Sequence, residues 1–291
     1  MKAGRHSRTA EAAAAARAKH LNHAPPPKVF EDPYAAALTS PAFRRFLGNR
    51  FLCWILYSTV LRSLRRGVAQ VLGRSRYAED CLEKALPAGI RQYVLIGAGL
   101  DSFALRRRDL EHGLQVIELD HPDTQRVKRS RLEQLGIDLP RNVDFVAADL
   151  SIEDIAKALQ RSRFEPGQPV FYSWLGTTMY LTNEATLATL KALAGCSAPG
   201  SEIVFDYVLP ESILSEDEAN ALAGMKQFVA SRGEPMMGEF APEELAKAVA
   251  ALGFEVVENL SAAEQTARYF AGRPDGLRPP HGFHFVHLRL P

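Results

Sequence analysis

The spacing of hydrophobic positions changes near residue 91 and divides the chain into two parts. Before that point, apolar residues recur every three or four positions, which is typical of helices that bury one face. After it, short apolar runs alternate with longer amphipathic segments, as in strands alternating with helices. The helical spacing is carried by Phe43, Phe46, Leu47, Leu52, Ile55, Leu56, Val60 and Leu64. The pattern predicts a mostly helical region followed by a sheet domain.

Seven apolar runs in the second part are candidate strands. They lie near residues 92–97, 115–120, 143–147, 169–174, 201–207, 254–259 and 283–290. Helical segments join most of them, which predicts an α/β fold with a doubly wound, seven-stranded, mostly parallel sheet. The last two runs are joined by residues 260–282, where no helix is evident. We therefore expect a hairpin-like pair and one antiparallel strand.

Two helix starts carry recognisable capping residues. Ser151, with Asp154 three positions later, resembles a capping box for a helix that runs to about Gln160. Thr182 can cap a helix that reaches Leu193, because its hydroxyl can accept from a free backbone N–H of the first turn.

The same patterns suggest a division of the chain. We expect a flexible N-terminal arm over residues 1–24, a helical cap over 25–90 and a cofactor-binding domain over 91–291, with a helical insertion near 211–238. The basic, acid-poor start of the arm also fits a transit peptide.

Composition excludes several classes of function. Among 291 residues, 35 Lys and Arg balance 34 Asp and Glu, so no bulk charge attracts nucleic acid or an anionic membrane. The most apolar window, residues 51–61, is far shorter than the ~20 residues of a membrane span. Cys53, Cys81 and Cys196 are widely spaced, which suggests neither disulfides nor a metal site and fits the cytoplasm.

The residues that follow the first two apolar runs indicate a nucleoside-bearing cofactor. The first run ends in Gly97-Ala98-Gly99-Leu100-Asp101, and the second ends in Glu118-Leu119-Asp120. Glycines let a backbone approach a ligand closely, and an acid about twenty residues later can accept from ribose hydroxyls. A dinucleotide fingerprint would need a third glycine, and Asp101 would repel phosphates. S-adenosylmethionine fits better because it carries a sulfonium and no phosphate.

A resemblance to a known family rests on several segments together. These are Asp32-Pro33-Tyr34, Arg74-Ser75-Arg76-Tyr77, Gly97-Ala98-Gly99-Leu100-Asp101-Ser102 with Arg106, Glu118-Leu119-Asp120-His121-Pro122, Asp149-Leu150, Met179-Tyr180-Leu181 and Arg232-Gly233-Glu234-Pro235. They resemble the leucine carboxyl methyltransferase-like family of class I S-adenosylmethionine-dependent methyltransferases, which have a Rossmann-like fold. Many bacterial members are O-methyltransferases of small molecules, some of them in polyketide pathways.

The resemblance implies roles for individual residues. Arg74 would pair with the carboxylate of the cofactor's methionine part, and the backbone of Gly97, Ala98 and Gly99 would lie against that part. A carboxylate at Asp101 would favour the cationic cofactor. The remaining assignments are Asp120, with Glu118 as the rival, for the ribose hydroxyls, Asp149 and Leu150 for adenine, and Ser173 facing the transferred methyl group. Glu118, Asp120 or Asp149 could instead act as a carboxylate at a helix start.

The acceptor side departs from the family pattern. Leu175 stands where the family commonly has a glutamate, so a protein C-terminus is a doubtful acceptor. Trp174, Thr177 and Tyr180, with Met225 from the insertion, suggest a weakly polar pocket, although both aromatic residues could simply pack in the core. Tyr180, His281 and His284 are candidate bases, with an exposed loop histidine and a strand residue as the alternative for the two histidines.

The sequence therefore predicts a cytoplasmic S-adenosylmethionine-dependent O-methyltransferase that acts on a small-molecule hydroxyl or carboxyl group and releases S-adenosylhomocysteine. Secondary metabolism is the expected setting, and the protein is expected to be a monomer or homodimer without a metal, nucleic-acid or membrane partner. The alternatives are a protein that binds the cofactor without methyl transfer and a nicotinamide-dependent dehydrogenase.

Overall fold

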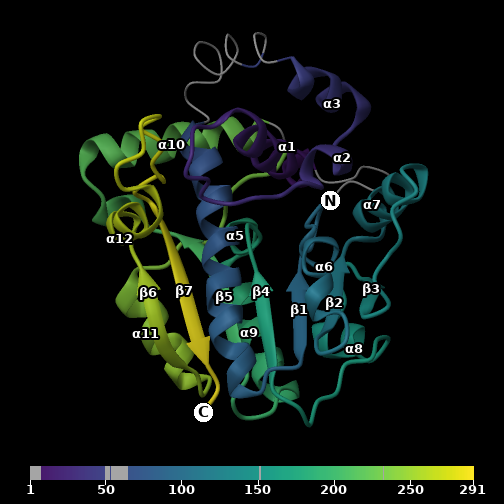
Figure 1. Ribbon diagram of the computed structural model, residues 1–291. Coiled ribbons are helices and arrows are strands. Elements are labelled where there is room, and N and C mark those ends of the chain that lie inside the picture. Colours follow the sequence, from purple (N-terminus) through teal and green to yellow (C-terminus); the bar gives the residue numbers. More distant parts are fainter. Residues whose placement is uncertain (1–7, 50–52, 54–64, 151, 232) are drawn as a thin grey trace.

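The computed structural model describes residues 8–49, 53, 65–150, 152–231 and 233–291, and these form a seven-stranded sheet flanked by helices (Figure 1). The strands lie in the order β3-β2-β1-β4-β5-β7-β6, and β7 runs antiparallel to both of its neighbours. Their bounds are β1 (Gln92–Ile96), β2 (Gln115–Asp120), β3 (Val143–Ala147), β4 (Val170–Trp174), β5 (Glu202–Val208), β6 (Glu255–Leu260) and β7 (Phe283–Arg289). The predicted fold class, with its antiparallel strand, is confirmed.

Helices cover both faces of the sheet, which explains why the central strands are apolar at every position. Side chains alternate between the faces along a strand, so Tyr93 and Leu95 of β1 pack with one helical layer and Val94 and Ile96 with the other. The first layer contains α5 (Arg65–Ala85) and α6 (Phe103–Arg106), and the second contains α8 (Ile155–Leu159), α9 (Asn183–Cys196) and α11 (Pro242–Ala251). Every residue of β1, β4 and β5 is buried as a result.

Two helix starts test the capping predictions. Thr182 accepts from the backbone N–H of Ala185 at 3.2 Å and caps α9, as predicted. The residue that caps α8 is Asp154, whose carboxylate accepts from Lys157 N at 3.1 Å. Ser151 lies outside the described residues.

The segment predicted as an N-terminal arm is helical over most of its length. Residues 8–23 form α1 (Arg8–His23), and four of its alanines, Ala14, Ala15, Ala16 and Ala18, are at most 5% exposed. Small side chains let this helix approach α2 (Ala35–Leu38), α3 (Pro41–Gly48) and α5 closely. Leu52, Ile55, Leu56, Val60 and Leu64 of the expected cap lie outside the described residues. The division into cap and cofactor domain stays a prediction.

The connection between β6 and β7 also differs from expectation, because it contains a short helix. Residues 262–270 form α12 (Ala262–Gln265) and the single turn η6 (Thr266–Phe270). Ser261 and Glu264 make a reciprocal capping box at its start. This pair of residues is a helix-start signal that the hydrophobic pattern alone did not provide.

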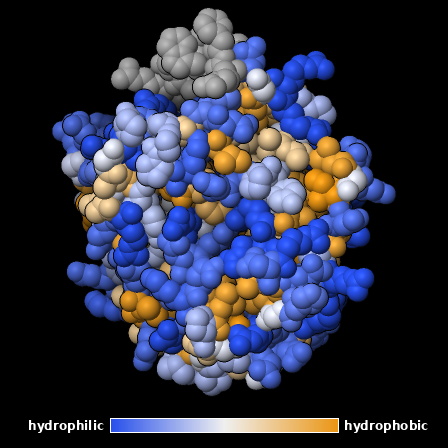
Figure 2. Space-filling model, in the orientation of Figure 1, coloured by the Kyte–Doolittle hydropathy of each residue, from blue (hydrophilic) through white to orange (hydrophobic). Residues whose placement is uncertain are grey.

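The remaining helices connect the strands or project from them. They are α7 (Pro122–Gln134), α10 (Glu216–Ala230) and the short turns η2 (Leu86–Ala88), η3 (Arg108–Leu110), η4 (Thr178–Tyr180) and η5 (Glu211–Ile213). Figure 2 shows hydrophilic side chains over most of one face, with small apolar patches between them. No helix in the described part of the chain is both long and apolar enough to cross a membrane.

Candidate functional site

A cavity of about 460 Å³ lies at the carboxyl ends of β1, β2 and β4. This is where open α/β sheets bind their ligands, and the volume is in the usual range for small-molecule sites. Its wall combines the turn after β1, Ser173 of β4 with residues of the loop 175–180, Arg74 of α5, the start of α1 and residues of the segment 233–237. Of the predicted site residues, the cavity brings together Arg74, Gly97, Ala98, Gly99, Asp101, Asp120, Ser173, Thr177 and Tyr180.

The glycine turn forms the floor of the cavity. Gly97 and Gly99 have φ values of +70° and +55°, a region that other residues rarely adopt. A Cβ added to Gly97 would lie 2.8 Å from Oγ1 of Thr177, and one added to Gly99 would lie 3.1 Å from Cβ of Ala10. Asp101 accepts from Phe103 N at 2.6 Å and so starts α6. Side chains at both glycines would close the space that a ligand needs.

The two acids of β2 have different surroundings. Asp120 lines the cavity, accepts from the backbone N–H of Gly99, and accepts from that of His121 at 2.6 Å. Burial raises the pKa of Asp120, while these backbone donors act in the opposite direction. Glu118 is 3% exposed and pairs with Nζ of the buried Lys128 at 2.5 Å. Glu118 is therefore a partner in a buried ion pair, whereas Asp120 lines the cavity.

Arg74 reaches the cavity from α5 and is held by a carboxylate of β5. Its NH1 group lies 3.2 Å from Oδ2 of Asp206, and the two side chains are 13% and 0% exposed. A guanidinium in this position can pair with a carboxylate group of a ligand. The expected contact with the cofactor's methionine part is consistent with this geometry and stays a prediction.

Two predicted adenine contacts lie outside the described cavity wall. Asp149 follows β3 and lies 3.8 Å from Nε2 of His121, and its side chain is 31% exposed. Leu150 packs against the core between the sheet and α8 and α9. The imidazole of His121 also caps α7, since its Nδ1 accepts from Asp123 N at 3.2 Å.

Several acceptor-side predictions are not supported by the geometry of the described residues. Trp174 is 1% exposed and packs against Phe205 in the core, with ring centroids 6.1 Å apart, because β4 continues to that residue. Met225 of α10 packs beside the buried cluster that contains Met179. Neither residue lines the described cavity wall.

The candidate bases also differ in position. His281 pairs with Glu218 at 2.9 Å at the surface, and His284 lies 3.1 Å from Oδ1 of Asn259. Both lie away from the described cavity wall, and only Tyr180 of the three lines it. Burial and the nearby Glu234 carboxylate raise the pKa of Tyr180, so its phenol stays protonated at neutral pH.

Sequence reasoning missed the residues that cover the cavity. Thr9, Ala10, Ala13 and Arg17 of α1 line it, as do Glu234 and Met237 from the segment after α10. Thr9 donates a hydrogen bond to the Glu234 carboxylate and joins the two segments. The motif Gly233-Glu234-Pro235 was a signal for this part of the wall, but nothing in the local pattern of α1 indicated a ligand site.

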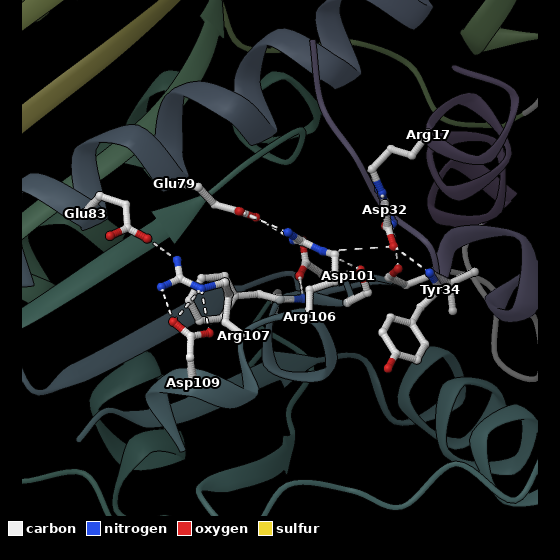
Figure 3. Close-up of polar contacts among 12 residues, drawn as sticks. Arg17, Asp32, Tyr34, Glu79, Glu83, Asp101, Arg106, Arg107 and Asp109 are labelled. Carbon is white, nitrogen blue, oxygen red and sulfur yellow. Dashed lines mark hydrogen bonds and ion pairs between the residues drawn. The ribbon is translucent and has the colours of Figure 1, made fainter. Parts of the chain in front are cut away.

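An ion-pair network fixes α1 against the glycine turn (Figure 3). Arg17 donates to Asp32 at 2.8 Å and to the carbonyl of Leu100 at 2.6 Å. Arg106 of α6 lies 3.9 Å from the same carboxylate and pairs with Glu79 of α5 at 2.5 Å. Burial alone would raise the pKa of Asp32, but the two guanidiniums outweigh it and hold that pKa below its usual value. The network thus joins α1, α5 and α6 around the turn.

No group of three or more metal-ligating side chains occurs within the described ranges. The cavity wall instead offers a guanidinium, a carboxylate at the end of β2 and two glycines that leave room for a ligand. These features fit three groups of S-adenosylmethionine. The guanidinium can pair with its carboxylate, the carboxylate of β2 can accept from its ribose hydroxyls, and the glycines leave room for its methionine part beside the protein backbone.

Comparisons with known proteins agree with this geometry. The sequence profile of the family described as "Leucine carboxyl methyltransferase" matches residues 10–194, more than half of the chain. A Bacillus subtilis protein named "Putative S-adenosyl-L-methionine-dependent methyltransferase YktD" is 33% identical over 216 residues, covering 74% of this chain and 71% of that protein. A Mycolicibacterium smegmatis protein named "Putative S-adenosyl-L-methionine-dependent methyltransferase" is 32% identical over 224 residues, covering 76% of this chain and 72% of that protein.

Solved structures show the same fold. A DUF574 family protein from Streptomyces avermitilis superposes with a TM-score of 0.61 at 15% identity, covering 95% of this chain and 97% of that one. The Thermobifida fusca structure titled as a putative methyltransferase gives a TM-score of 0.56 at 16% identity, covering 88% and 92%. The profile and the two relatives show that this chain belongs to the leucine carboxyl methyltransferase family of S-adenosylmethionine-dependent methyltransferases.

Proposed function

We propose that this protein transfers the methyl group of S-adenosylmethionine to a hydroxyl oxygen of a small molecule of secondary metabolism. The observation that carries the proposal is the Glu234 carboxylate on the cavity wall, in contact with Thr9 and close to Tyr180. The sequence left both a hydroxyl and a carboxyl group open as the acceptor, and the proposal selects the hydroxyl.

The position of Glu234 suggests that it faces the acceptor rather than the cofactor. Its segment follows the ends of β4 and β5, since Met237 N donates to Met179 O at 2.8 Å and Phe240 N donates to Val208 O at 2.9 Å. The proposed cofactor contacts lie along β2, β1 and β4, which leaves the Glu234 side for the acceptor.

Charge favours a hydroxyl over a carboxylate acceptor. An ionised Glu234 would repel a second carboxylate, whereas it can take the proton of a hydroxyl group. Tyr180, which keeps its own proton, can donate a hydrogen bond to the acceptor oxygen. Leu175 adds an apolar wall where the family commonly has a glutamate, which supports a small molecule over a protein C-terminus.

When bound, S-adenosylmethionine supplies a methyl group on a positively charged sulfur. The chain's own part is to hold and align the reactants, which can provide most of the acceleration in such a displacement. In this proposal Arg74 binds the cofactor's carboxylate, Asp120 accepts from the ribose hydroxyls, and Glu234 takes the acceptor's proton. The cover made by α1 and residues 233–237 limits the access of water.

Labelled methyl transfer into bacterial extract tests this function. We expect the wild type with methyl-labelled S-adenosylmethionine to form a labelled small molecule whose methyl group survives alkaline hydrolysis, as an ether does and an ester does not. Glu234→Gln should lower the rate at least about a hundredfold, the usual contribution of a general base. Glu216→Gln, an exposed change on α10, is the matched control.

Three other outcomes would contradict the proposal. A base-labile methyl ester would identify a carboxyl acceptor. Equal rates for Glu234→Gln and the control would remove the assigned role of Glu234. Tight cofactor binding with no labelled product in any extract would favour the alternative, a protein that binds the cofactor without methyl transfer. The dehydrogenase alternative is dropped, because the chain belongs to a methyltransferase family.

A further inference from the structure

Asp206 is a fully buried carboxylate next to the cavity, and the assignments above give it no role. It lies on β5 with 0% exposure. Among the described residues, its side chain accepts from Gly176 N at 2.6 Å, from Nε2 of Gln70 at 3.1 Å and from NH1 of Arg74 at 3.2 Å. Its backbone carbonyl also accepts from the hydroxyl of Thr178. Asp206 therefore joins α5 and the loop after β4 at one point behind the cavity wall.

The backbone at Gly176 is shaped around the same guanidinium. Gly176 has a φ of +67°, and a Cβ at this position would overlap the guanidinium of Arg74. The guanidinium thus contacts the Asp206 carboxylate through NH1 and also lies against the bare backbone of Gly176. A long, flexible arginine side chain is confined here to one orientation.

Burying a carboxylate is unfavourable unless it is paired and hydrogen-bonded. Among the described residues, Asp206 meets that requirement through Gly176, Gln70 and Arg74. Within the part of the chain that the structure describes, Arg74 has Asp206 as its hydrogen-bonded partner through NH1 alone. The other donors of its planar fork stay available to a second anion. The pair therefore fixes the guanidinium in direction while leaving it able to bind a carboxylate in the cavity.

We propose that Asp206 is a positioning residue: it orients Arg74 toward the carboxylate of the cofactor's methionine part. It thereby sets the preference of the site for ligands that carry this carboxylate. The proposal rests on the proposed cofactor contact of Arg74. It adds a residue that touches no ligand and acts through Arg74.

Asp206→Asn is a suitable test because the surroundings can accept it. An asparagine oxygen can still accept from Gly176 N. Its amide group can donate to Oε1 of Gln70 once the Gln70 amide, which now points Nε2 at Asp206, turns over; that oxygen is buried without a partner among the described residues. The variant removes the charge and keeps the shape. Asp144→Asn is the matched control, since Asp144 is also a strand aspartate paired with an arginine, Arg163 at 2.8 Å, but away from the cavity.

The measurement is calorimetric binding of two ligands to the full chain. One is S-adenosylhomocysteine, and the other is S-adenosyl-3-thiopropylamine, which lacks only the carboxylate. We expect Asp206→Asn to weaken S-adenosylhomocysteine binding about ten- to a hundredfold, the scale for a hydrogen bond to a charged group. Binding of the decarboxylated ligand should change less than about twofold, because Arg74 makes no carboxylate contact with it.

The outcomes separate this proposal from the proposed function. If Asp206→Asn weakens the binding of both ligands equally, Asp206 supports the cavity as a whole and the proposal is overturned. Unchanged affinity for S-adenosylhomocysteine overturns it too. In both cases the proposed function stands. If the wild type binds neither ligand, the proposed function fails and this proposal fails with it.

Gly176→Ala provides a second variant that leaves Asp206 in place, in case Asp206→Asn does not fold. Its Cβ would displace the guanidinium of Arg74, so the same selective loss for S-adenosylhomocysteine is expected. Gly195→Ala is its control, because a Cβ at Gly195 in α9 meets no atom within 4 Å. Equal loss for both ligands in Gly176→Ala would count against the proposal.

Discussion

The two halves of the cavity wall are assembled in different ways. The proposed cofactor half, with the glycine turn and Asp120, comes from the carboxyl ends of two neighbouring parallel strands, β1 and β2, and Arg74 of α5 adds to it. The proposed acceptor half comes from α1, residues 175–180 and residues 233–237, which lie far apart in the chain. Adjacent parallel strands bring their carboxyl ends together whatever the rest of the fold does. The acceptor half exists only after long-range packing, so it can diverge while the cofactor half is kept.

The largest expected effect is a loss of folding stability on replacing Glu118, an acid of β2 to which we assign no ligand contact. Glu118→Ala would leave Lys128 buried without its partner, and such losses typically cost about 3–5 kcal/mol of stability. Urea unfolding measures this loss. Glu133→Ala, an exposed change on the same helix as Lys128, should stay within about 0.5 kcal/mol of the wild type.

The assignment of a structural role to Glu118 would be wrong if this residue contacted the cofactor. A Glu118→Ala protein that keeps its stability and loses affinity for S-adenosylhomocysteine would exchange the roles assigned to Glu118 and Asp120.

Asp120→Ala should have a smaller effect of a different kind. We expect affinity for S-adenosylhomocysteine to fall by about 1–3 kcal/mol, the range for losing a charged hydrogen-bond partner. Calorimetry on the folded variant measures it, with Asp138→Ala at an exposed position as the control. Unchanged affinity would show that the cofactor half holds the ribose by other groups.

The smallest effect is a pH dependence of the acceptor half. His20 of α1 accepts from Val29 N at 2.9 Å, and burial, with Arg273 and Lys28 nearby, lowers its pKa to about 4. The unfolded chain, with a histidine pKa near ~6.5, binds the proton first as pH falls. Stability from this group is therefore complete above about pH 6.5 and is lost between about pH 6.5 and 4.

Allowing for screening by solvent, the loss at acidic pH is about 1–2 kcal/mol. Urea unfolding at several pH values measures it. His20→Gln should flatten the dependence between these limits, whereas His112→Gln, at an exposed position, should not. A slope that is the same in all three proteins would assign the acid sensitivity to other groups.

The sheet and the cofactor half could be predicted because their signals are local. Strands buried on both faces read as apolar runs, and the seven predicted runs match β1 to β7 within about two residues. The glycine turn is marked by its own residues, since only glycine suits two left-handed positions so close together.

The rest depended on contacts between distant residues. An alanine-rich helix such as α1 carries little amphipathic pattern, and its burial depends on Asp32 and Leu100. From the sequence, Trp174 could line a pocket or pack in the core. It packs in the core because β4 extends to it and Phe205 lies against it. Asp206 reads as one polar residue inside an apolar strand until α5 places Arg74 against it.

The direction of β7 has a practical consequence for handling the protein. Because β7 is antiparallel to β5, it ends at Arg289 on the side of the sheet away from the carboxyl ends of β1, β4 and β5 (Figure 1). The cavity lies at those carboxyl ends, and Thr9 and Ala10 of α1 line it. A fluorophore or purification handle attached after β7 would therefore lie on the side of the sheet away from the cavity. Attachment to a biosensor chip through the carboxyl end should therefore preserve ligand exchange.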